Sequence, residues 1–286
     1  MKNVPTTPKS IARRTVIAAA LIACGLLAGC ETYNAMMGSG TSVTATDSKR
    51  LTKSGFLSDY ARLRPNPLAQ DIECWREAGL DAKQYDKVMI ARIVVTLKAG
   101  NPEVKEDPID PTDLKTLTDY FYDAMVKALK PQMAVVDKPG PGVVVIRIAL
   151  TDLVPTTVTD SLAGTLIPYA FIAEAGSGAA TGRPVGSTPY MGETGMEMQF
   201  RDGATGNILA ECRDTQIGRK YASDMNQGAV GAAQTWASGY MNSFQAWSYA
   251  KNAFDKWSLI VATRFAELRG LKPTPTPASA PVPPPK

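Results

Sequence analysis

The sequence predicts an α+β fold: a single domain with a largely antiparallel sheet and helices packed on one face, flanked by disordered tethers. Three observations lead to this prediction. Apolar residues alternate along short segments, as in strands, and recur at spacings of three and four in two longer segments, as in helices. A turn-rich pentapeptide separates the last two strand segments. In chain order the elements are strand, helix, strand, strand, an irregular segment, a hairpin and a final helix.

Residues 88–97 form the first predicted strand. Alternation in steps of two places one apolar set on a single face, namely Met89, Ala91, Ile93, Val95 and Leu97. We therefore expect that face to point into the core.

Residues 110–130 form the first predicted helix. Asp110 suits the N-cap and Pro111 the first helical position, while Lys127 and Lys130 complement the C-terminal end before Pro131. The apolar stripe of this helix consists of Leu114, Leu117, Phe121, Met125 and Ala128. Its spacing predicts one buried face.

The next two predicted strands cover residues 133–136 and 143–150. A run of alternating proline and glycine at 139–142 separates them. The second strand is almost continuously apolar and is interrupted only by Arg147. Such a run is typical of a central strand that is covered on both faces.

A hairpin and a long helix end the domain. The strands at 193–201 and 207–215 flank the turn Asp202-Gly203-Ala204-Thr205-Gly206, and the helix covers residues 244–268. Aromatic residues recur through this last third of the chain. They predict either a helix face that packs on the sheet or an exposed platform for a partner or a glycan formed by Trp236, Tyr240 and Trp247.

The N-terminus has the three zones of a secretory signal peptide. A basic start with no acidic residue precedes an apolar run of about 13 residues, which is too short to cross a bilayer. The run ends in Leu27-Ala28-Gly29-Cys30, which resembles the lipobox of bacterial lipoproteins. That resemblance implies removal of residues 1–29 and lipid attachment to Cys30. A plain signal peptide with a coincidental cysteine is the alternative.

Lipid attachment sets the expected location. Two or more acyl chains hold a protein firmly at a membrane, because each buried CH₂ contributes about 0.8 kcal/mol. Glu31 after the cysteine resembles the pattern of lipoproteins sorted to the outer membrane. We therefore predict a protein lipid-anchored at the bacterial outer membrane, on its periplasmic face.

Flexible segments are predicted on both sides of the domain at 54–271. Residues 30–53 are rich in small and polar residues and predict a lipidated tether. Residues 272–286 contain seven prolines and predict a disordered tail that favours polyproline II. This tail is either a solvated end or a spacer toward an envelope partner.

Composition excludes several function classes. The chain has no histidine, which removes His-dependent catalytic triads and His-ligated zinc. The signal peptide holds four of the 31 basic residues, so the mature chain has 27 basic and 27 acidic residues. This balance predicts no nucleic-acid partner.

Two cysteines remain in the mature domain. Cys74 and Cys212 would lie in an oxidising compartment, where they either form a disulfide or pack as two buried thiols. Two cysteines without histidine predict no metal site. No cofactor is expected apart from the lipid on Cys30.

Catalytic motifs are weak. Ser248-Tyr249-Ala250-Lys251 matches the S-x-x-K pattern of penicillin-binding proteins, but its companion motifs stand in the wrong order. The acids Asp59, Asp86, Asp152 and Asp160 are candidates for acid–base chemistry without any spacing that pairs them. We therefore expect no enzyme activity.

Several short motifs together resemble one family, the proteobacterial lipoproteins known as domain of unknown function 3313. They are residues 55–60 with Leu63, residues 85–90, Val136-Asp137 with residues 139–142, residues 149–152, Asp202 with Thr205-Gly206, and residues 253–257. The resemblance covers about 51–271. It implies an envelope location and a single domain, and it supplies no catalytic residue.

Three functions remain in order of preference. The first is a non-enzymatic accessory or interaction domain for an envelope assembly or transport system, with an envelope protein as partner. The second is a carrier or sensor for a lipid, glycan fragment or apolar solute, with a pocket beneath the apolar segment 162–172. The third is a carboxylate-based hydrolase, which requires two buried, convergent acids in a cleft.

Overall fold

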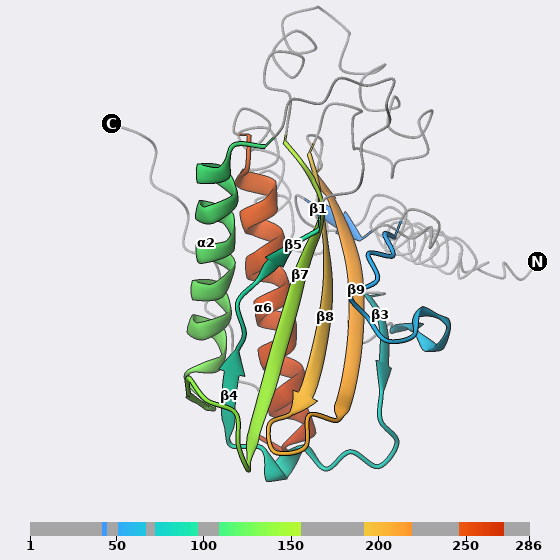
Figure 1. Ribbon diagram of the computed structural model, residues 1–286, viewed down its shortest axis with the longest axis vertical. Coiled ribbons are helices and arrows are strands. Elements are labelled where there is room, and N and C mark those ends of the chain that lie inside the picture. The colour runs from blue at the N-terminus through green and yellow to red at the C-terminus, as the bar shows by residue number, and fades with distance from the viewer. Residues whose placement is uncertain are drawn as a thin grey trace, which may run out of the picture.

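The computed structural model describes residues 42–44, 51–66, 72–96, 109–155, 192–218 and 246–271. Within these ranges one mixed sheet of nine strands carries two α-helices on one face (Figure 1). The predicted α+β class is confirmed. The signal peptide, Cys30, the segment 162–172 and the proline-rich tail lie outside the described residues.

The strands follow the order β2-β3-β9-β8-β7-β4-β6, with β1 also on β9 and β5 also on β7. Most neighbours are antiparallel, whereas β4 and β5 run parallel to β7, and β6 runs parallel to β4. The strand bounds are β1 Ser42–Thr44, β2 Arg64–Asn66, β3 Ile72–Arg76, β4 Lys87–Ile90, β5 Val94–Val95, β6 Ala134–Val135, β7 Val143–Val154, β8 Glu193–Asp202 and β9 Ile208–Gly218.

The long antiparallel strands β7, β8 and β9 form the centre of the sheet. The predicted hairpin is present as β8 and β9, and its turn is held by Asp202, whose carboxylate accepts hydrogen bonds from the backbone N–H groups of Ala204 and Thr205. Gly206 has a φ of 77°, a conformation that glycine adopts without steric cost. The predicted central strand is β7, which lies between β8 and the parallel β4.

The strand predicted over 88–97 is wrong in length and in phase. The chain leaves the ladder after Ile90 and returns as β5, and both β4 and β5 pair with β7. Val88 and Ile90 are buried, whereas Met89 and Ala91 of the predicted face are only half-buried. Because the break at 91–93 shifts the alternation, Ile93 regains the core on the far side of it.

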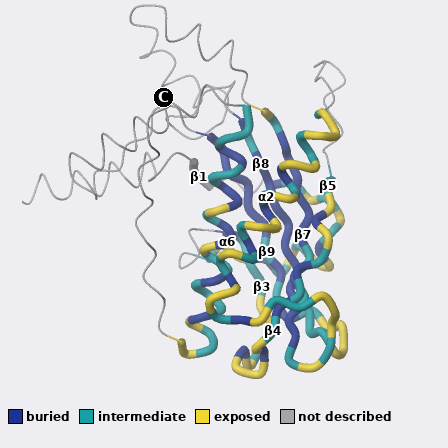
Figure 2. Tube along the Cα trace, turned by 90° about the vertical axis from the view of Figure 1, so that its left-hand side faces the viewer, coloured by how far each residue is buried: buried dark blue, intermediate teal, exposed yellow. Residues whose placement is uncertain are grey.

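The two helices form the second layer. Helix α2 covers Pro111–Leu129, and the Asp110 carboxylate caps it by accepting from the Thr112 N–H at 2.6 Å, as the sequence predicts. Helix α6 covers Ser248–Leu268 and so begins four residues later than predicted. Figure 2 shows the buried sides of both helices turned toward the sheet.

Aromatic rings join the two helices above the sheet. Phe121 of α2 stacks on Phe254 of α6 with ring centroids 4.5 Å apart, and Trp257 lies 5.9 Å from Phe121. All three side chains are fully buried. The aromatic stripe of the last helix is therefore core, at least over residues 254–257.

The predicted tether over 30–53 contains residues that belong to the fold. Strand β1 pairs with Gln216–Gly218 of β9, directly beyond the part of β9 that pairs with β3. Leu51 is buried against Ile217. The fold therefore begins before the predicted boundary at residue 54. Backbone pairing at a sheet edge requires no apolar run, so the polar composition of this segment hid it.

Candidate functional site

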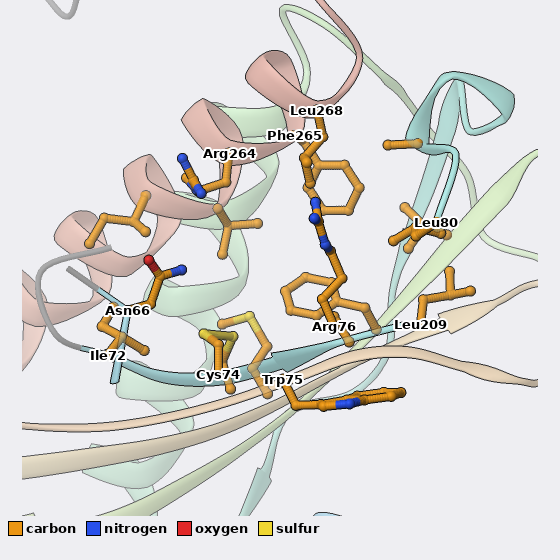
Figure 3. Close-up of a pocket in the computed structure, with 18 of the residues that line it drawn as sticks. Asn66, Ile72, Cys74, Trp75, Arg76, Leu80, Leu209, Arg264, Phe265 and Leu268 are labelled. Carbon is orange, nitrogen blue, oxygen red and sulfur yellow. A yellow bond between two sulfur atoms is a disulfide. The ribbon is translucent and has the colours of Figure 1, made fainter. Parts of the chain in front are cut away.

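The sheet extends farther than the helices that cover it. Figure 1 shows α2 beside β4 at the left and α6 behind β4, β7 and β8, whereas β3 lies beyond β9 at the other edge. A pocket of about 260 Å³ lies where the C-terminal half of α6 faces β3, β8 and β9. Figure 3 shows its lining side chains.

The interior of this pocket is apolar. Alternation along β8 turns Met196, Met198 and Phe200 toward the helix layer, and a spacing of three and four along α6 aligns the opposite wall. The α6 wall consists of Trp257, Ile260, Val261, Phe265 and Leu268, and the remaining side is formed by Ile72, Leu80, Ala82, Tyr85, Val144, Leu209 and Ala210. The sequence did not predict this pocket, because its walls come from four distant segments.

Polar groups lie at the edge of the pocket. Arg76 at the end of β3, Arg264 on α6 and Asn66 on β2 are among its lining residues. Arg76 is exposed, and no ion pair or hydrogen bond joins its side chain to another described residue. Arg264 is paired with Glu267 one turn along the helix. The site thus combines an apolar interior with a cationic edge.

A disulfide forms part of the pocket floor. Cys74 and Cys212 are direct partners across β3 and β9, with Cα atoms 4.1 Å apart, and the structure joins them by a disulfide. Of the two alternatives left open by the sequence, the bridge is the one present. It ties the edge strand β3 to the central sheet.

The opposite face of the sheet is covered by residues 51–63, which we name the N-terminal clasp. Two buried glutamates of that face, Glu197 and Glu211, are exposed by 1% and 0%. Glu197 accepts hydrogen bonds from the Ser54 N–H at 3.0 Å and the Tyr60 hydroxyl at 2.9 Å. Burial and the adjacent Glu197 carboxylate raise the pKa of Tyr60.

The second glutamate is held in the same way. Glu211 accepts from the Ser58 N–H and hydroxyl, both at 2.8 Å, from Arg62 at 2.5 Å and from the Gln199 amide at 2.6 Å. Burial alone raises the pKa of Glu211, but the hydrogen bonds from Arg62, Ser58 and Gln199 outweigh it. The net pKa of this carboxyl is lowered.

Cations stack on aromatic rings around the same network. The guanidinium of Arg62 lies 3.4 Å from the centre of the Trp75 ring, and that of Arg213 lies 5.5 Å from the Tyr60 ring. Arg213 also pairs with Glu73 at 2.7 Å. The clasp is thus bound to the sheet by charge, hydrogen bonds and ring contacts.

This network indicates a structural role for the two glutamates. The hydrolase hypothesis requires buried acids that converge in an open cleft. Glu197 and Glu211 are buried, but their carboxylate oxygens are occupied by the clasp. The sequence did not reveal either glutamate. Both lie on a sheet face that a polar loop covers, so the residues of that face are polar and look like solvent-exposed positions in the sequence.

The acids singled out from the sequence lie apart. Asp59 caps a short 3₁₀ helix at Tyr60–Arg62, and Asp86 is an exposed neighbour of Lys87. Asp152, with a φ of 50°, accepts from the hydroxyls of Thr52 and Thr151. Asp160 lies outside the described residues. The structure therefore does not bring the three described carboxylates together.

The S-x-x-K segment forms the first turn of α6. Tyr249 is buried, and its hydroxyl donates to the backbone carbonyls of Val154 and Glu193. Lys251 lies over the ring of Tyr120, 5.4 Å from its centre. These contacts are those of a packed helix start.

Of the three aromatics predicted as a partner surface, the structure describes Trp247. Its side chain is half-buried, and its indole N–H donates to Asp113 of α2 at 2.9 Å. The Trp247 side chain therefore contacts the first turn of α2. Trp236 and Tyr240 lie outside the described residues.

Metal-binding clusters and membrane-spanning helices are both absent from the described part of the chain. Within the ranges given above, no cluster of three or more acidic, cysteine or histidine side chains is arranged to bind a metal ion. Neither described helix is long and apolar enough to cross a bilayer.

Acid should loosen the clasp through Glu211. Because the folded-state pKa is below the ordinary value of 4.5, Glu211 contributes stability above that value and loses it as the pH falls through the folded pKa. Asp202, whose pKa is lowered by hydrogen bonds from Thr205 and Tyr85, acts in the same direction. We expect Glu211→Gln to flatten the acid limb of a urea-unfolding profile. An unchanged acid limb would show that Glu211 is not held by the clasp in solution.

Comparisons with known proteins give one family and several distant structures. A family model described as protein of unknown function (DUF3313) matches residues 52–240, which is more than half of the chain. The match ends before α6, although the sequence resemblance extends to about residue 271. No curated protein matches the chain.

The similar solved structures are distant, and three of them illustrate this. The PelC dodecamer from Paraburkholderia phytofirmans is 10% identical, with 61% of this chain and 96% of that chain covered and a TM-score of 0.28. Protein XCC0632 from Xanthomonas campestris (DUF330) is 11% identical, with coverages of 64% and 91% and a TM-score of 0.27. A DUF4136 family protein from Bacteroides thetaiotaomicron is 12% identical, with coverages of 61% and 96% and a TM-score of 0.24.

Proposed function

The chain belongs to the family of proteins of unknown function DUF3313, and from that premise we propose that it is a non-enzymatic accessory protein of the bacterial envelope that binds an apolar solute. The family description names no activity, so the support for this function comes from the residues of this chain. The observation that carries it is the apolar pocket between α6 and the sheet.

The size and lining of the pocket support ligand binding. Apolar cavities of about 150 Å³ already bind small hydrocarbons, and typical ligand sites start at about 300 Å³. At about 260 Å³ this pocket lies between the two. A fully packed core would leave no such space beside Trp257 and Val261.

The polar groups near the pocket favour binding over catalysis. The hydroxyl of Tyr85 donates to Asp202 at 2.8 Å, and burial and this carboxylate raise the pKa of Tyr85 to about 12. A phenol of that pKa is a poor general base at neutral pH. The two lining cysteines are joined in the disulfide and supply no thiolate nucleophile.

A direct test uses a hydrophobic photoprobe. Membranes that carry the full-length protein are incubated with a neutral fatty acid methyl ester bearing a diazirine, irradiated, and digested for peptide mapping. We expect labelled peptides from Ile72–Arg76 and from 257–268, and loss of both in Val261→Trp, which fills the pocket. Labelling confined to other peptides would overturn the binding function.

The location is part of the same proposal. The lipobox at 27–30 supports a lipid on Cys30, and Glu31 supports sorting to the outer membrane. We expect the intact mass of the protein to equal that of the polypeptide from Cys30 plus its acyl groups. The Cys30→Ser variant should no longer be found in the lipidated membrane fraction. An unmodified wild-type chain in the aqueous fraction would contradict this.

The accessory role also requires an envelope protein that delivers or receives the solute. Cross-linking in intact cells, followed by affinity purification of the full-length chain, should recover such a protein in proportion to the cross-linker used. Recovery of no envelope protein, with Cys30→Ser as the unanchored control, would argue against an accessory role and leave the pocket to be tested separately.

A further inference from the structure

We infer that the pocket takes an amphiphile with one hydrocarbon chain and an anionic head, and that Arg76, assisted by Arg264, binds the head. This inference rests on the proposed function, because it names the class of solute that the same pocket takes. It follows from the size of the cavity and from the charges at its edge.

The volume of the cavity favours a ligand with a single hydrocarbon chain. Ligand sites that enclose drug-sized molecules reach about 300–1,000 Å³, and this cavity is about 260 Å³. One hydrocarbon chain fits along the wall formed by Trp257, Val261 and Leu268, whereas a second chain would have to lie outside it. A diacyl lipid would therefore leave apolar surface in water, at a cost that grows with each exposed CH₂.

The edge of the pocket selects an anion. Arg76 is exposed and, among the described residues, is not held by an ion pair, while Arg264 shares its charge with Glu267. The local charge of these three side chains is therefore positive. Figure 3 shows Arg76 rising from β3 toward the helix that carries Arg264 and Phe265. The head group of a ligand whose hydrocarbon chain lies in the pocket would meet this guanidinium first.

Guanidinium chemistry suits a carboxylate or a phosphate. Its planar N–H groups bind two oxygens at once, which fixes orientation as well as charge. The Asn66 side chain lines the same edge of the pocket. An ammonium head would be repelled by Arg76, and a neutral head would gain only weak hydrogen bonds there.

The experiment compares three photoprobes of equal chain length on full-length protein in membranes: a fatty acid, its methyl ester and the corresponding amine. All carry the diazirine at the same carbon, and pocket labelling is quantified on the peptides from Ile72–Arg76 and 257–268. We expect the acid to label best, the ester less and the amine least. Arg76→Gln should reduce labelling by the acid about fivefold and leave labelling by the ester unchanged. The reason is that the acid loses a charge-assisted hydrogen bond at a partly exposed site.

The controls separate this inference from the proposed function. Arg92→Gln removes an exposed arginine that does not line the pocket, and it should leave all three probes unchanged. Equal labelling by acid, ester and amine, or an acid preference that survives Arg76→Gln, would overturn the head-group inference while the pocket still binds. Absence of pocket labelling by every probe would overturn the proposed function itself. An alkyl phosphate probe in a fourth arm tells whether carboxylate or phosphate binds better, and stronger labelling by either anion than by the ester supports the inference.

Discussion

Replacing Trp257 by alanine is expected to lower the free energy of unfolding by about 3–5 kcal/mol, the usual loss for a large aromatic side chain in a core. Trp257 is fully buried, and its ring lies 5.9 Å from Phe121 and 6.1 Å from Phe254. Its indole N–H donates to the buried Asp214 carboxylate at 2.8 Å. The substitution therefore opens a cavity and also removes the hydrogen bond that the Asp214 carboxylate accepts from the indole.

The state of Asp214 makes this loss larger. Burial raises the pKa of Asp214, and the Lys256 charge and hydrogen bonds from Trp257 and Gln216 oppose that rise. Without the indole N–H the carboxylate is less well compensated, so the variant should lose more stability as the pH rises. Urea unfolding at two pH values measures both effects.

Leu259 provides the matched control on the same helix. Its side chain is 41% exposed, so Leu259→Ala should change the unfolding free energy by no more than about 0.5 kcal/mol. Equal effects of the two substitutions would mean that α6 does not pack on the sheet through Trp257.

Removing the disulfide is the second large effect. The bridge between Cys74 and Cys212 spans 138 residues, and the double variant Cys74→Ser, Cys212→Ser is expected to lose about 2–5 kcal/mol. Strand β3 has only five residues and pairs with β9 at four positions, so it depends strongly on this link. Its loosening should also open the pocket.

A reducing agent separates the bridge from the side-chain change. The wild-type protein should lose stability in excess thiol reductant, whereas the double variant should show the same unfolding curve with and without it. A wild-type protein that is equally stable in both conditions would mean that the bridge contributes little.

Local signals in the sequence predicted much of the fold. The caps and stripe of α2, the turn between β8 and β9 and the apolar run of β7 each lie within one segment, where periodicity and turn chemistry act directly. The short strands β2 and β3 went unpredicted, because three to five residues carry too little pattern. The break after Ile90 was missed because alternation cannot show where a strand leaves its neighbour.

The site was less predictable than the fold. The pocket walls, the clasp over Glu197 and Glu211 and the position of Trp247 against Asp113 all depend on contacts between residues far apart in the chain. The polar character of residues 51–53 indicated a tether in isolation, although their contacts with the sheet make the same residues part of the fold.

The sequence by itself determined the class of the domain, the prediction of a lipid on Cys30 and the exclusion of histidine chemistry, because each depends on local pattern or on composition. Only the tertiary structure decided that Cys74 meets Cys212, that the two glutamates are occupied by the clasp, and that an apolar pocket with a cationic edge lies beside α6. The physical reason is that packing of distant segments creates cavities and buried charges, and no single segment encodes them.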